Sequence, residues 1–155
     1  MRKPNWVLGL SIIVCLSLAA AIASAENKNP RFGKWKLKSD APPPALNIMT
    51  YEPYGETGMK ITVENTNTKG EKRTWSYVTL FDGKYRPVEG DTNTDETAVE
   101  VVDAHTNKIM NKTGDRVNVI INVLSADGNT INNEYRNVDE NGKVTVTHAV
   151  YERIQ

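Results

Sequence analysis

Apolar and polar residues alternate along most of the chain beyond residue 31. In the stretch 58–65, Met59, Ile61 and Val63 share one face, and polar residues occupy the other. A period of two is typical of a β-strand with one buried face. No stretch has the period of a long amphipathic helix, and the nearest candidate, 96–104, is rich in β-branched valine. The pattern predicts strands at 32–38, 46–54, 58–65, 71–81, 84–88, 97–103, 107–112, 116–125, 129–137 and 143–153.

Turn sequences containing glycine separate these segments. Asp82-Gly83, Asp127-Gly128 and Asn141-Gly142 are pairs that favour tight hairpins, because they tolerate positive φ angles. Many short strands joined by hairpins would leave exposed edges in a flat sheet, and closing the sheet into a barrel removes those edges. A two-sheet sandwich is the alternative, but it needs longer crossover connections. We therefore predict an all-β fold, an antiparallel up-and-down β-barrel of about 8–10 strands with no helical lid.

The beginning of the chain has the pattern of a cleavable signal peptide. Arg2 and Lys3 are basic, residues 6–18 are largely apolar, and Ala23-Ser24-Ala25 is a small-residue cleavage site. The apolar stretch is shorter than the roughly 20 residues that span a bilayer. We predict a signal peptide over residues 1–25, cleavage after Ala25, and a secreted or periplasmic location.

Cleavage would leave a short segment, 26–31, followed by one β-barrel domain over 32–155. This mature part contains no cysteine, because the single cysteine is Cys15, so its stability cannot depend on disulfides. Loss of Arg2 and Lys3 reduces the basic residues from 19 to 17 against 19 acidic ones, a net charge of about −2. A near-neutral chain has no electrostatic reason to bind nucleic acid or an anionic membrane, and we predict neither as a partner.

Several short motifs resemble a known family. Phe32-Gly33-Lys34-Trp35-Lys36-Leu37 is similar to the Gly-x-Trp opening strand of the calycins, which include lipocalins and fatty-acid-binding proteins. Tyr51-Glu52-Pro53, Asp82-Gly83-Lys84 and Val150-Tyr151-Glu152-Arg153 resemble, in order and spacing, the small exported bacterial proteins called lipocalin-like. The resemblance covers most of residues 32–153. It implies a β-barrel, a bacterial envelope protein and a small apolar ligand.

The last predicted strand departs from the family in one position. Fatty-acid-binding proteins hold a ligand carboxylate with an arginine and a tyrosine on this strand. Tyr151 matches the tyrosine, whereas Ala149 occupies the position of the arginine. A charge-assisted hydrogen bond to a carboxylate is therefore not expected from that position.

Aromatic residues are the candidate ligand contacts. Trp75, Tyr77 and Phe81 are predicted to lie on one face of a strand, where they would line a pocket or fill a core. Neighbouring residues on a strand point to opposite faces, so only one of Tyr135 and Arg136 faces inward, and we choose Tyr135. The predicted ligand-binding residues are Trp75, Tyr77, Phe81, Tyr135 and Tyr151.

One end of the barrel is expected to be closed by side-chain packing. Trp35 follows Gly33 by two residues in the first strand, and a large aromatic side chain in that place favours a core position. A guanidinium group would stack on its ring as a cation–π pair. The sequence offers Arg153 or Arg136 for this contact, and we predict Gly33, Trp35 and Arg153 as the closing set.

The sequence contains no recognisable catalytic or metal-binding motif. The two histidines, His105 and His148, have no cysteine to complete a zinc site, and residues 91–95 lack the glycine of a calcium loop. We predict no enzyme activity, no metal and no cofactor. Two functions stay open: a binding module for a small hydrophobic ligand, and a filled barrel that acts as a structural or inhibitor-like module on an envelope protein partner.

Overall fold

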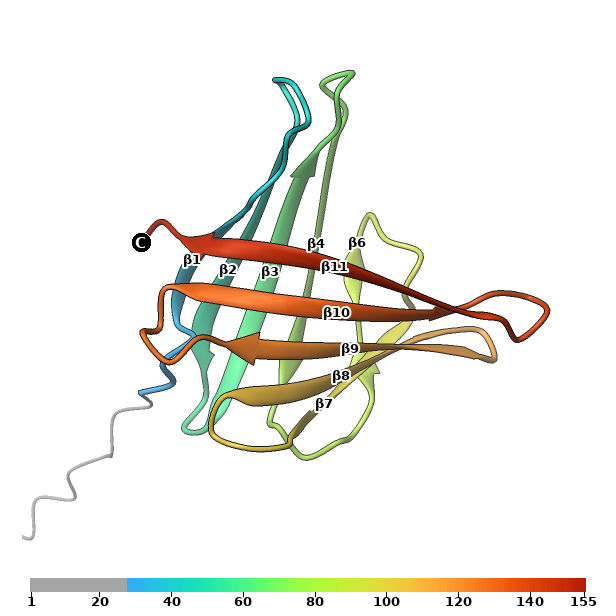
Figure 1. Cartoon of the computed structure of the whole chain (residues 1–155). Coiled ribbons are helices and arrows are strands. Elements are labelled where there is room, and N and C mark those ends of the chain that lie inside the picture. Colours follow the sequence, from blue (N-terminus) through green and yellow to red (C-terminus); the bar gives the residue numbers. More distant parts are fainter. Residues whose placement is uncertain (1–27) are drawn as a thin grey trace, which may run out of the picture.

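The computed structural model describes residues 28–155, so the predicted signal peptide lies outside the described residues. The described part contains eleven strands and no helix (Figure 1). No helix that could cross a membrane occurs among these residues. The strands are β1 (Gly33–Leu37), β2 (Leu46–Tyr54), β3 (Gly58–Thr66), β4 (Lys72–Thr79), β5 (Arg86–Pro87), β6 (Glu89–Gly90), β7 (Glu96–Val101), β8 (Thr106–Thr113), β9 (Arg116–Leu124), β10 (Thr130–Val138) and β11 (Val144–Arg153).

All strands pair antiparallel, mostly with their neighbours in sequence. The strands from β1 to β4 form one run and those from β7 to β11 another, and β11 pairs back onto β1 with Trp35 opposite Arg153. The remaining seam is bridged by the short segment 86–90. Its first part, β5, pairs with β7, and its second part, β6, pairs with β4. The predicted up-and-down barrel is therefore confirmed, and it closes through this one segment.

The predicted strands match the observed ones closely, with two differences. The strand β6 was not predicted: one strand was expected at 84–88, whereas the structure has the two short strands β5 and β6 there, each paired with a different neighbour. The strand predicted at 71–81 ends at Thr79. Phe81 has a φ of 59°, which is outside the β conformation, so it does not continue the face that carries Trp75 and Tyr77. The prediction that all three aromatic residues alternate on one strand was wrong in this respect.

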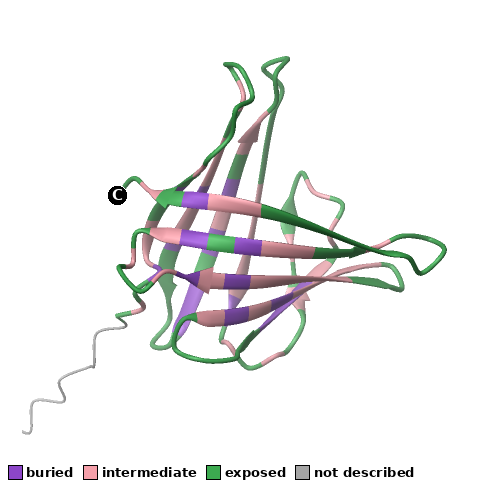
Figure 2. Cartoon of the chain, in the orientation of Figure 1, coloured by how far each residue is buried: buried purple, intermediate pink, exposed green. Residues whose placement is uncertain are grey.

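Trp35 is the centre of the packed end of the barrel. Its side chain has no solvent exposure, and its Nε1 donates a hydrogen bond of 2.9 Å to the carbonyl oxygen of Arg31. The guanidinium carbon of Arg153 lies 4.1 Å from the centre of its ring. Arg136, the other candidate for this contact, instead bonds Glu134. Figure 2 shows that the buried residues concentrate in the half of the barrel nearest the C-terminus. The buried core consists of Trp35, Met49, Tyr51, Met59, Ile61, Val63, Leu124, Ile131 and Tyr151.

Gly33 is required by the close approach of the end of the chain. Its φ is 127°, and a Cβ at this position would lie 2.2 Å from the backbone oxygen of Gln155. The N–H of Lys34 donates to the same oxygen at 2.9 Å. Gly33, Trp35 and Arg153 therefore lie together at the packed end.

The interior is more polar on β9 and β10 than the alternation of valines suggests. On β9, Val117 and every second residue after it form an apolar face that points away from the interior. Asn122 lies on the opposite face and is 1% exposed. Asn133 on β10 is also buried. Amide side chains thus occupy positions inside the barrel, and they shape the cavity described next.

Candidate functional site

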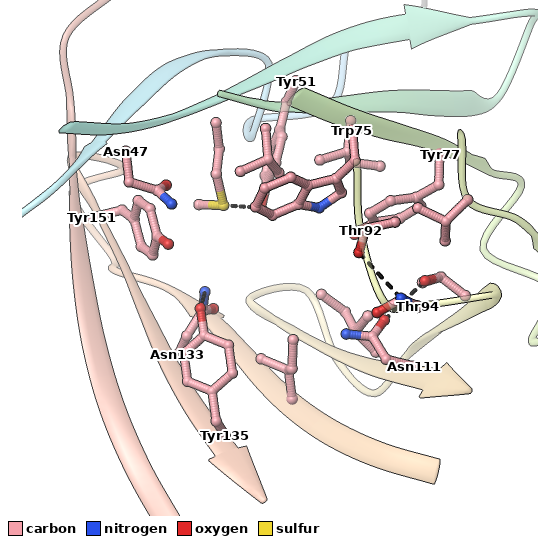
Figure 3. A pocket seen from close by; sticks show the side chains of 17 residues that line it. Asn47, Tyr51, Trp75, Tyr77, Thr92, Thr94, Asn111, Asn133, Tyr135 and Tyr151 are labelled. Carbon is pink, nitrogen blue, oxygen red and sulfur yellow. Dashed lines mark hydrogen bonds between the residues drawn. The ribbon is translucent and has the colours of Figure 1, made fainter. Parts of the chain in front are cut away.

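The barrel contains a partly open cavity of about 230 Å³ beyond the packed end (Figure 3). It is bounded by every second residue of the main strands, because successive side chains of a strand point to opposite faces. The segment that closes the barrel seam and the loop after it also contribute. The lining residues are Asn47, Met49, Tyr51, Ile61, Val63, Trp75, Tyr77, Val88, Thr92, Thr94, Thr97, Ile109, Asn111, Ile120, Asn133, Tyr135 and Tyr151.

Four of the five residues that the sequence suggested for a ligand site line this cavity. Trp75 and Tyr77 contribute from β4, Tyr135 from β10 and Tyr151 from β11. Phe81 does not line it, because the chain turns after β4, and its side chain packs against the core cluster instead. Figure 3 shows Tyr135 and Tyr151 on one side of the cavity and Trp75 and Tyr77 on the other.

The polar amides of the cavity wall were missed by the sequence analysis. Asn47, Asn111 and Asn133 line the cavity, and the Oδ1 of Asn111 accepts a hydrogen bond of 2.8 Å from the hydroxyl of Thr97. Asparagine is generally depleted in strands and favoured in turns, so composition alone gave no reason to place these residues inside. The one available signal was their position in the alternation, since Asn133 and Tyr135 share a face.

A chain of hydrogen bonds leads from Arg31 at the packed end to the cavity. The Nε of Arg31 donates to Asn122 Oδ1 at 3.1 Å, and Asn122 Nδ2 donates to Asn133 Oδ1 at 2.8 Å. Asn133 Nδ2 then donates to the hydroxyl oxygen of Tyr135 at 3.2 Å. Burial lowers the pKa of Arg31 from its usual value, although its guanidinium keeps hydrogen-bond partners. The chain satisfies buried polar groups and gives each amide a defined orientation.

Burial favours the neutral form of three tyrosines of the cavity. It is the main cause that raises the pKa of Tyr51, Tyr77 and Tyr151 above the ordinary value, and the neighbouring tyrosines add to the effect. For Tyr151, the interaction with the Tyr135 hydroxyl is one of these causes. The cavity therefore offers neutral hydroxyl groups, which can donate or accept hydrogen bonds.

Asn47 differs from the other amides of the wall. Its Oδ1 is buried and accepts no hydrogen bond from the described part of the chain. The side chain also borders a second, wider hollow of about 450 Å³ between the connector that precedes β2 and the ends of β2 and β3. Buried acceptors in proteins are normally paired, so an open one beside a cavity is a group available to a ligand.

The remaining chemical candidates lie elsewhere. Asp103 accepts the N–H of His105 at 2.8 Å within a turn, and this bond is the main cause that lowers the pKa of Asp103. His148 is exposed and lies 3.5 Å from Glu134 on the outer surface. Residues 28–155 contain no group of three or more His, Cys, Asp or Glu side chains that could hold a metal ion.

Comparison with known proteins supports the barrel fold. No protein-family model matches the chain, and no curated protein matches it in sequence. A structure of the Schistosoma mansoni fatty acid binding protein in complex with arachidonic acid is similar, with a TM-score of 0.58 and 15% identity, over 83% of this chain and 99% of that one. The fluorescent protein UnaG has a TM-score of 0.55 and 12% identity, over 79% of this chain and 96% of its own. These similarities show that the chain has the fold of the fatty-acid-binding barrels.

Proposed function

We propose that this protein binds a small apolar molecule inside its barrel. The observation that carries the proposal is the cavity of about 230 Å³, which the packed core leaves open. Its wall combines aromatic and aliphatic side chains with a few polar groups, the usual composition of small-molecule sites. The alternative, a filled barrel that acts through its outer surface, would need an interior packed to normal density. The unfilled volume therefore favours the binding function.

The cavity limits the size of the ligand. Its volume of about 230 Å³ equals that of about eight water molecules at roughly 30 Å³ each. Typical pockets for drug-sized molecules range from about 300 to 1,000 Å³. The enclosed part of the ligand therefore has on the order of eight non-hydrogen atoms. A longer molecule would have to extend through the opening, and a long acyl chain would not be enclosed.

The proposal extends to the location of the protein. Residues 1–25 have the pattern of a secretory signal peptide, and the domain that follows has no cysteine. We propose a secreted or periplasmic binding module that holds a small hydrophobic molecule outside the cytoplasm. N-terminal sequencing of the protein from the periplasm or medium tests this point, and the expected first residue is Glu26. Recovery only from the cytoplasm with residues 1–25 attached would contradict the proposed location.

The function is tested by examining the protein for a bound molecule. The chain is purified without detergent, its mass is measured under native conditions, and the sample is extracted with organic solvent. We expect an apolar molecule in stoichiometric amount, and quenching of Trp75 fluorescence when such a molecule is added to stripped protein. A mass without ligand, together with no response of Trp75 to a panel of small apolar compounds, would refute the proposal.

A matched pair of variants assigns the binding to the cavity. Ile120 lines the cavity, and Ile121 lies next to it on the opposite face of β9. Ile120→Phe places a larger side chain in the cavity, reduces its free volume and should weaken ligand binding at least tenfold. Ile121→Phe makes the same change outside the cavity and should leave affinity unchanged. Equal effects of the two substitutions would place the ligand elsewhere.

A further inference from the structure

The cavity wall has no formal charge. None of the seventeen lining residues, which Figure 3 draws as sticks, is an acidic or basic residue, and burial raises the pKa of Tyr51, Tyr77 and Tyr151 among them. A carboxylate or an ammonium group that entered this space would lose its hydration and gain no partner of opposite charge. Burial of an ion without such a partner is far more costly than burial of a neutral polar group.

Two arginines lie at the packed end of the barrel, where their guanidinium groups donate hydrogen bonds to oxygens of the chain. Arg153 donates to the carbonyl oxygens of Gly128, Phe32 and Pro30 at 2.9, 2.7 and 2.6 Å. Arg31 donates to Asn122 and, at 2.5 Å, to the carbonyl oxygen of His105. Neither arginine lines the cavity, so neither guanidinium faces a ligand there as the partner of a carboxylate.

The hydrogen-bond chain that starts at Arg31 ends in a donor. Because a guanidinium only donates, Asn122 must present its oxygen to Arg31 and its nitrogen to Asn133. Asn133 in turn donates to the oxygen of Tyr135, so the hydroxyl proton of Tyr135 is free to be donated onward. Tyr135 lines the cavity, so this proton can be donated directly to a ligand. The cavity wall therefore presents an O–H donor at Tyr135.

An acceptor complements this donor. Asn47 lies on the same side of the cavity as Tyr151 and Tyr135 in Figure 3, and its buried Oδ1 is unpaired among the described residues. A ligand group that donates a hydrogen bond would satisfy it. A carboxylate has no proton to donate, and its negative charge would face this oxygen unfavourably.

We infer that the cavity selects a neutral ligand with a short apolar body and a head group that both accepts and donates a hydrogen bond, such as a hydroxyl or a primary amide, and that it discriminates against carboxylates. The head group would accept from Tyr135 and donate to Asn47. The apolar body would lie against Trp75 and the aliphatic side chains. This inference rests on the proposed function and specifies the class of ligand.

Three probes of equal chain length test the head group. Heptan-1-ol, heptanamide and heptanoate are titrated at neutral pH into the isotope-labelled chain, and binding is followed by NMR chemical shifts. Heptanamide and heptanoate differ chiefly in charge and in the presence of a donor. We expect both neutral compounds to bind at least tenfold more tightly than heptanoate, with shifts in the cavity residues.

The outcomes separate the inference from the proposed function. If heptanoate binds in the cavity as tightly as heptanamide, the inference is overturned and the binding function stands. If none of the three compounds binds, both the proposed function and the inference fail. Binding of the two neutral compounds alone supports both.

A pair of tyrosine variants tests the donor. Tyr135→Phe removes the hydroxyl that ends the chain and should lower the affinity for heptan-1-ol and heptanamide about fivefold to tenfold, as expected for one hydrogen bond. Tyr85→Phe removes a hydroxyl from an exposed tyrosine outside the cavity and should change neither affinity. The far-ultraviolet circular dichroism of both variants checks that they fold. An unchanged affinity of folded Tyr135→Phe for heptan-1-ol and heptanamide would overturn the role of this hydroxyl.

Discussion

Replacement of Trp35 tests whether the packed end holds the barrel together. The side chain is fully buried, its ring is covered by Arg153 at 4.1 Å, and its Nε1 bonds a backbone oxygen at 2.9 Å. Trp35→Ala therefore removes packing, a cation–π contact and a hydrogen bond together. Large-to-small substitution of a buried tryptophan costs about 3–5 kcal/mol, most of it from lost transfer free energy and the cavity left behind.

Trp35→Phe separates these contributions. A phenyl ring keeps much of the packing and the contact with Arg153, but it leaves the carbonyl oxygen of Arg31 without its indole donor. A hydrogen bond of this kind contributes about 1 kcal/mol. We therefore expect a loss of about 1–2 kcal/mol for Trp35→Phe, clearly smaller than that for alanine.

The free energy of unfolding is measured by urea titration, followed by far-ultraviolet circular dichroism so that loss of the indole does not affect the signal. Trp75→Ala is the comparison, because Trp75 is only partly buried in the cavity wall, and it should cost less than Trp35→Ala. The slope of the transition should be the same for all variants. A loss under about 1 kcal/mol for Trp35→Ala would refute the role of Trp35 at the packed end.

Two further predictions concern the seam and the alkaline range. A Cβ on Gly90, which has a φ of 104°, would lie 2.3 Å from the carbonyl oxygen of Thr74, so Gly90→Ala should separate β6 from β4, lower the melting temperature and weaken ligand binding. Gly114→Ala is the control, because a Cβ there would meet nothing within 4 Å, and it should lower the melting temperature less. An equal decrease in melting temperature for the two variants would count against the role of the seam. Burial raises the pKa of Tyr51 and Tyr77 above 10.0 in the folded chain, so their contribution to stability is complete below pH 10 and declines above it, by up to about 1.4 kcal/mol per pH unit for each tyrosine. Ultraviolet difference spectroscopy should show that these tyrosines ionise only together with alkaline unfolding, and early ionisation with the fold intact would contradict the burial argument.

The alternation of apolar and polar residues, together with the turn residues, determined most of the architecture. The longer strands were predictable because a half-buried strand shows a period of two, and Asp127-Gly128 and Asn141-Gly142 mark the hairpins β9–β10 and β10–β11. Asp82-Gly83 forms no such hairpin, because β4 pairs with β6 and β5 pairs with β7. The missed strand, β6, has two residues and exists only because it bridges β4 to the segment that pairs with β7. Such pairing depends on where distant strands lie, and local sequence does not report it.

The functional part of the interior depended on the tertiary structure. The sequence indicated Trp75, Tyr77, Tyr135 and Tyr151 as inward aromatic residues, and all four line the cavity. It gave no warning that Phe81 leaves the strand through a positive φ.

The sequence specifies strands with one apolar and one polar face and the turns between them, because these follow from local backbone preferences and from the period of two. It did not determine which face of β9 and β10 is inside, and there the buried amides Asn122 and Asn133 occupy the interior. Polar groups are stable in that place only because Arg31 and Tyr135 complete their hydrogen bonds. Those partners come from distant parts of the chain, so closure of the barrel decided that uncharged polar side chains line its cavity together with apolar ones.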